Sequence, residues 1–144
     1  MGILDGLKGM LGGKKGLGFD NLHAETDTKK FSGLDVHDVT GYILRVIDGD
    51  YNYLILTLIE PVQNCNLIHI RKDGKERNVS MELSIANEET GKNKLFSKFG
   101  LSSDKALEII TAIVEKNALP KFDDWIEVGE FGDPRELWNK NKAK

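Results

Sequence analysis

The segment 65–86 constrains the fold more than any other part of this 144-residue chain. Apolar and polar side chains alternate from Val79 to Ile85, which is the period of a β-strand with one buried face. An Asp-Gly pair at 73–74 precedes this run and favours a two-residue hairpin turn, because both central positions need positive φ. The pattern therefore predicts strands at 65–72 and 75–86, with Ile68 opposite Val79. The residues expected to face the core are Ile68, Ile70, Val79, Met81, Leu83 and Ile85, and those expected on the other face are His69, Ser80, Glu82 and Ser84.

A second hairpin is predicted upstream, from strands near 40–47 and 51–60. Tyr42, Leu44 and Val46 alternate with their neighbours, and Asp and Gly residues at 48–50 favour a turn. The run 51–59 is apolar on both faces, which is typical of a strand that is covered on two sides or lies at an interface. Pro61 ends this strand, because proline cannot donate to a ladder.

The C-terminal half predicts one main helix over 104–117. Ser103 is the expected N-cap, Asn117 can adopt the left-handed C-cap conformation, and Pro120 prevents continuation. Residues 122–128 predict a short strand, and Asp133 with Pro134 predicts the start of a short C-terminal helix. Strands followed by a helix favour an α+β fold. We expect an antiparallel sheet of four to five strands, made of two hairpins and packed by the main helix.

The N-terminal segment differs in composition from the rest, because residues 1–18 contain seven glycines. Its apolar residues share one face of a helix, but interior glycines cost about 1 kcal/mol each relative to alanine. We therefore expect a helix that forms only when docked on a surface. The sequence predicts a flexible glycine-rich tail and linker over 1–30 and a single α+β domain over 31–144. The expected docking residues are Ile3, Leu4, Leu7, Met10 and Leu11.

Composition argues against several classes of function. A formal net charge of −3 is atypical of a nucleic-acid-binding protein, and no apolar run reaches the ~18 residues of a membrane span. The single cysteine excludes an internal disulfide framework. Cys65 and His69 are four residues apart, which on a strand means about 13 Å, too far to share one ion. We expect no metal, no cofactor, no nucleic acid, no stable membrane anchoring and a cytoplasmic location.

Acidic and aromatic residues are concentrated between 123 and 138. Such a mixture can provide aromatic anchors and a charged rim for a basic protein partner. The other interpretation is that the aromatic residues are core anchors and the acids are their solvated neighbours. The candidate partner-binding residues are Asp123, Asp124, Trp125, Glu127, Glu130 and Phe131.

Each catalytic motif considered fails at a specific position; for example, no G-x-S-x-G nucleophile elbow is present. The sequence therefore favours a non-catalytic binding or adaptor protein, chaperone-like or partner-neutralising, whose partner is a basic protein or a second copy of the chain. The alternative is a small enzyme whose site is assembled from scattered residues, such as Cys65 and a histidine.

Overall fold

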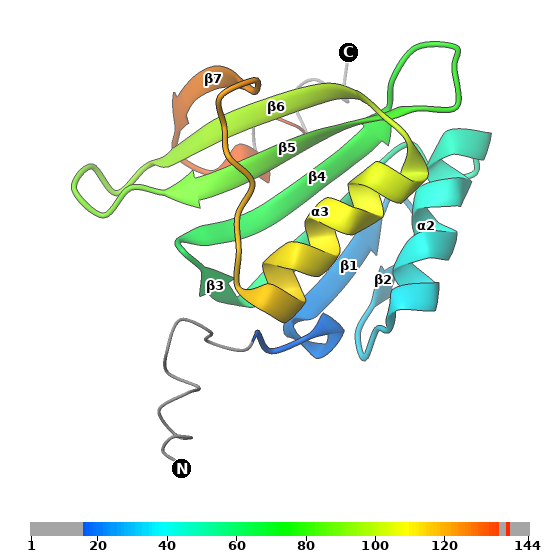
Figure 1. Ribbon diagram of the computed structural model, residues 1–144, viewed down its shortest axis with the longest axis horizontal. Helices are drawn as coiled ribbons and strands as arrows, with labels where there is room; N and C mark the ends of the chain where they lie inside the picture. The colour runs from blue at the N-terminus through cyan, green and yellow to red at the C-terminus, as the bar shows by residue number, and fades with distance from the viewer. Residues whose placement is uncertain (1–15, 136–137, 139–144) are drawn as a thin grey trace.

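The computed structural model describes residues 16–135 and 138, in which seven strands form one antiparallel sheet (Figure 1). Their order across the sheet is β2-β1-β3-β4-β5-β6-β7. The strands are β1 (Leu22–Thr26), β2 (Lys30–Phe31), β3 (Leu54–Val62), β4 (Cys65–Lys72), β5 (Val79–Ala86), β6 (Asn93–Leu101) and β7 (Ile126–Phe131). The helical elements are the 3-10 turn η1 (Phe19–Asn21) and the helices α2 (Val36–Asp48) and α3 (Ser103–Lys116).

Both helices lie on the same face of the sheet (Figure 1). The main core fills the space between these helices and the sheet. It contains Ile43 of α2, Ile110 of α3 and Met81 of β5, each fully buried. The predicted inward face of β4 and β5 is confirmed, since Ile68, Ile70, Val79, Met81 and Leu83 belong to this core and Ile85 packs against it. The α+β class and the antiparallel sheet are confirmed as well.

The predicted main helix is present as α3, with small differences at its start. Its N-cap is Ser102, one residue before the predicted Ser103, and the Ser102 hydroxyl accepts a hydrogen bond from the Lys105 N–H. Asn117 adopts the predicted left-handed conformation, with φ of 55°. The short strand predicted at 122–128 is β7, shifted to 126–131.

The strand predicted at 40–47 is wrong, because this segment belongs to the helix α2. Its β-branched and aromatic residues favour a strand by propensity, but local signals on both sides favour a helix. Asp35 and Asp38 form a capping box at the start, and Gly49 ends the helix with φ of 88°. The buried residues Val39, Ile43, Val46 and Ile47 follow the spacing of one helix face.

The predicted number of strands is too low, and the upstream hairpin does not exist. β3 pairs with β1 and β4 instead, both antiparallel. β1 lies within residues 1–30, where a flexible tail and linker were expected, and β2 begins at the last residue of that segment. The docking segment, Ile3, Leu4, Leu7, Met10 and Leu11, lies outside the described residues.

The register predicted for the hairpin of β4 and β5 is also wrong. Lys72 pairs with Val79 and Ile68 with Leu83, so the connection spans 73–78 rather than two residues. The Asp73 carboxylate accepts a hydrogen bond from the Gly100 N–H at 2.6 Å, which ties this connection to the end of β6. The residues predicted for each face are still correct, because the observed and predicted registers differ by an even number of residues.

Neighbouring residues of α2 distinguish the helix from the predicted strand. Ile43→Ala is expected to lower the free energy of unfolding by about 2–5 kcal/mol, because it leaves a cavity in the core. Leu44→Ala is expected to cost less than about 1 kcal/mol, because Leu44 is 37% exposed. Urea unfolding of both variants measures the difference. Equal losses, or a larger loss for Leu44→Ala, would contradict the helical assignment.

Candidate functional site

The sheet face opposite the helices, here called the open face, carries a row of mostly polar residues. Strand register places one residue from every strand side by side, and in antiparallel pairs such neighbours point to the same face. His69 and Glu82 lie at the centre of this row, as predicted for the face turned away from the core. The complete row is Lys30, Glu25, Ile55, His69, Glu82, Ser97 and Ile126.

Glu82 organises the centre of the row. One carboxylate oxygen accepts the Trp138 indole N–H at 2.7 Å, and the other accepts the Ser97 hydroxyl at 2.9 Å. His69 Nδ1 lies 3.8 Å from the first oxygen. Burial alone would raise the pKa of Glu82, but the interactions with His69, Ser97 and Trp138 outweigh it and hold the pKa below its usual value. Glu82 is therefore an anion at neutral pH.

His69 lies beneath Trp138, with their ring centroids 4.1 Å apart. Only 5% of its side chain is exposed. Burial lowers the pKa of His69, although the nearby Glu82 carboxylate acts in the opposite direction. The imidazole is therefore neutral at pH 7, and the cluster holds one negative charge, on Glu82.

The order of the groups in this cluster does not suit nucleophilic catalysis. In a serine hydrolase the imidazole lies between the hydroxyl and the carboxylate, so that it can remove the hydroxyl proton. Here Glu82 lies between Ser97 and His69. Instead, Glu82 provides the hydrogen-bond acceptor and His69 the ring contact that hold Trp138 on the sheet, where 8% of that residue is exposed.

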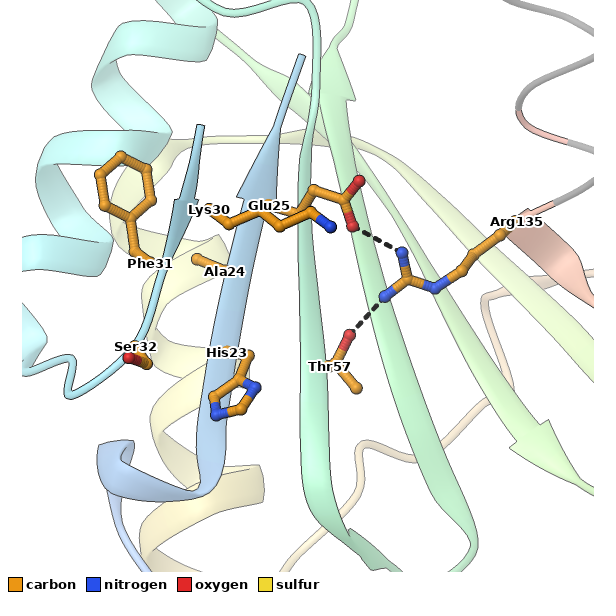
Figure 2. Close-up of a pocket in the computed structure, with 8 residues that line it drawn as sticks. All are labelled: His23, Ala24, Glu25, Lys30, Phe31, Ser32, Thr57 and Arg135. Atoms are coloured by element: carbon orange, nitrogen blue, oxygen red, sulfur yellow. Dashed lines mark hydrogen bonds and ion pairs between the residues drawn. The ribbon is translucent and has the colours of Figure 1, made fainter. Parts of the chain in front are cut away.

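Arg135 makes a second contact between the C-terminal segment and the open face. Its guanidinium donates to the Glu25 carboxylate and to the Thr57 hydroxyl, each at 2.6 Å (Figure 2). These partners belong to β1 and β3, so Arg135 bridges two strands. Asp133 accepts a hydrogen bond from the Arg135 backbone N–H, which agrees with the helix start predicted at this point.

A pocket of about 550 Å³ lies beside Arg135, over β1 and β2 (Figure 2). In the part of the chain that the structure describes, its lining combines basic side chains, hydroxyl groups and one carboxylate. Its polar lining residues are His23, Glu25, Lys30, Ser32, Thr57 and Arg135.

The predicted acidic partner-binding residues lie on and just before β7, and all four are exposed. Two of them have basic partners, since Asp124 is paired with Lys98 and Glu127 lies 3.8 Å from Lys94. The Lys98 ammonium holds the pKa of Asp124 below its usual value. Glu130 accepts a hydrogen bond from the neutral Asn87 side chain. Among the described residues, Asp123 and Glu130 have no ion-pair partner.

The two predicted aromatic anchors do not form one surface. The Trp125 ring contacts the Phe122 ring edge-on, with their centroids 5.4 Å apart, and packs against the core on the helix side. Phe131 packs on the open face, against the cluster of Ile55, Leu67, Leu95 and Trp138. Both are partly buried, so they contribute to the core as well as to the surface near β7.

The structure places Cys65 and His69, which are four residues apart, on opposite faces of the sheet. Cys65 belongs to the core on the helix side, whereas His69 contacts Trp138 on the open face. Cys65 is fully buried, and burial raises its pKa to about 12, so it carries almost no thiolate at neutral pH. Among the described residues, no group of three or more His, Cys, Asp or Glu side chains could hold a metal ion.

Sequence reasoning placed His69 and Glu82 on the correct face but missed Ser97, Arg135 and Trp138 as parts of this site. The segment 94–99 is short and its pattern is ambiguous between structures, so the sequence predicts no neighbours for Ser97. Arg135 and Glu25 are 110 residues apart, and no local periodicity indicates that they meet.

No family model, curated protein or solved structure matches this chain. In the part of the chain that the structure describes, neither helix is long and apolar enough to cross a membrane.

The buried His69 predicts a pH dependence of stability. Because its pKa lies below the usual 6.5 in the folded protein, the unfolded chain binds the proton more readily. The free energy of unfolding is expected to fall as the pH drops below about 6.5, by at most ~1.4 kcal/mol per pH unit for one proton. Glu82 adds a separate loss below about pH 4.5, because its pKa is also lowered. Urea unfolding between pH 8 and 5 measures the first step.

Two histidine variants provide the comparison. His69→Gln should reduce the slope of the free energy of unfolding against pH between pH 7 and 5. His37→Gln removes an exposed histidine of α2 and should leave this slope unchanged. A wild-type slope that survives in His69→Gln would contradict the assignment to His69.

Cys65 provides an independent test of burial. At pH 8 a thiol reagent such as Ellman's reagent is expected to react with the folded protein only as fast as the chain opens, and rapidly in urea. Rapid stoichiometric reaction without denaturant would show that the thiol is accessible and contradict its place in the core.

Proposed function

We propose that this is a non-catalytic binding protein that holds an extended, basic segment of a partner protein along the free edge of β7. The observation that carries the proposal is that this edge is unpaired among the described residues and exposes both apolar and acidic side chains. β7 pairs only with β6 among the described residues, and it presents the exposed apolar side chains Ile126 and Val128 between acidic ones.

A free strand edge offers backbone N–H and C=O groups that an added strand can pair with. Ile126 is 57% exposed and Val128 is 43% exposed, so an incoming strand would bury apolar area as well as form backbone hydrogen bonds. β7 is six residues long, which is the typical length of a strand in a folded protein.

The charges near β7 favour a basic occupant. Asp123 and Glu130 have no ion-pair partner among the described residues, and Asp124 and Glu127 are exposed despite their lysine neighbours. The edge of a second copy would bring the same acidic residues and repel this one. This acidic edge therefore favours a basic segment over self-association.

The irregular backbone of β7 also limits unspecific pairing. The ladder to β6 shifts between Leu95 and Phe96, and Gly129 has φ of 141°. Such a bulge bends the edge, which disfavours flat edge-to-edge aggregation. A short segment could still pair along part of the strand, which suits an adaptor or a chaperone-like protein.

A synthetic peptide of alternating lysine and valine tests this proposal directly. We expect saturable binding by isothermal calorimetry at low salt, with backbone amide shifts in 126–131. Asp123→Asn with Glu130→Gln should weaken binding about fivefold, because two exposed ion pairs contribute roughly 0.5 kcal/mol each. The same peptide with glutamate in place of lysine should not bind.

The control is Glu76→Gln with Glu115→Gln, which removes the same number of exposed charges away from β7. This double variant should bind like the wild type, apart from a small general effect of net charge. If both double variants weaken binding equally, or if the amide shifts lie outside β7, this edge is not the binding site.

A further inference from the structure

The pocket at the opposite end of the sheet from β7 has a lining that suits a small anion. It lies over β1 and β2 (Figure 2), and these strands are at the opposite edge of the sheet from β7 (Figure 1). We propose that this pocket binds a small organic molecule through one oxyanion group, a carboxylate or a phosphate ester. This site is independent of the peptide-binding function proposed for β7.

The charge balance of the lining carries the proposal. Among the described residues, the lining has two permanent cations, Lys30 and Arg135, and one carboxylate, Glu25. Figure 2 shows Lys30 extending from β2 across β1 toward the pair of Glu25 and Arg135. Arg135 is paired with Glu25, whereas Lys30 has no ion-pair partner among the described residues. A single negative charge brought by a ligand would therefore balance the pocket.

Arg135 is held in place before any ligand arrives. Its bonds to Glu25 and Thr57 fix the guanidinium between β1 and β3. A guanidinium has five N–H groups, so these two bonds leave others available. A donor that is already positioned loses little side-chain freedom when a ligand binds, which favours affinity.

The remaining polar residues add hydrogen-bonding groups around the same space. Ser32 and Thr57 provide hydroxyls, and His23 provides an imidazole. His23 is exposed on the open face, beside Thr57 in strand register. Oxyanions are recognised in proteins by such combinations of basic side chains and hydroxyl groups.

The size of the pocket indicates a molecule rather than a bare ion. Its volume of about 550 Å³ lies within the range of small-molecule sites, roughly 300–1,000 Å³. An inorganic anion would fill a small part of it. A ligand with an oxyanion group and a body of about one ring would use both the charge and the space.

Titration of the full-length protein with benzoate and with phenyl phosphate tests the site and separates the two oxyanion classes. Saturable amide shifts are expected at 23–25, 30–32 and 57 for at least one of them, measured by two-dimensional NMR. Benzamide and phenol have similar rings without the charge and should cause no saturable shift.

Two adjacent lysines provide a matched pair of variants. Lys30→Gln removes the cation without an ion-pair partner and should weaken binding about fivefold. Lys29→Gln removes a neighbouring exposed lysine that does not line the pocket and should bind like the wild type. Unfolding curves of both variants verify that each is folded.

Three results would overturn the proposal. One is the absence of saturation by either anion up to 20 mM, and another is equal weakening by Lys29→Gln and Lys30→Gln, which would indicate unspecific attraction. The third is equal binding of the neutral analogues, which would show that the ring and not the charge is recognised.

Discussion

Both helices pack against one face of a seven-stranded sheet, and this asymmetry decides how the rest of the surface is arranged. The other face carries Ile55, Leu67 and Leu95, which need cover from water. In the described part of the chain, neither α2 nor α3 covers this face. Trp138 of the C-terminal segment packs against these three residues instead. That segment contacts the centre of the sheet through Trp138 and its β1 side through Arg135. The pocket and the β7 edge, where we propose binding, lie on either side of this contact.

Glu82 is the residue that makes this cover specific. A carboxylate at a largely buried position is costly unless hydrogen bonds compensate for the lost water. Ser97 and Trp138 provide such bonds, and His69 lies beside the same carboxylate. A purely apolar face could accept an aromatic ring in many orientations, whereas an acceptor at this point selects the one that directs the indole N–H toward it. Arg135 is held separately, through its own bonds to Glu25 and Thr57.

The sequence predicts best where a local pattern coincides with a single environment. Alternation over 79–85 gave the correct buried face of β5, and the cap residues Asn117 and Pro120 indicated the end of α3. Propensity misled at 40–47, where β-branched residues outweighed the capping box of Asp35 and Asp38. β1 was missed because a five-residue strand with His23 and Glu25 on its open side resembles a polar linker. The contacts of Arg135 and Trp138 join segments far apart in sequence, which no periodicity reveals.

The most direct test of this account is the environment of the Trp138 indole N–H in solution. The chain has two tryptophans, so two indole signals are expected in a two-dimensional NMR spectrum. The account predicts that the Trp138 N–H exchanges slowly with deuterium, that its ring shows nuclear Overhauser contacts to His69, and that Glu82→Gln shifts its signal more than that of Trp125. Exchange of the Trp138 N–H at the rate of free tryptophan, without contacts to His69, would show that the C-terminal segment does not cover the open face.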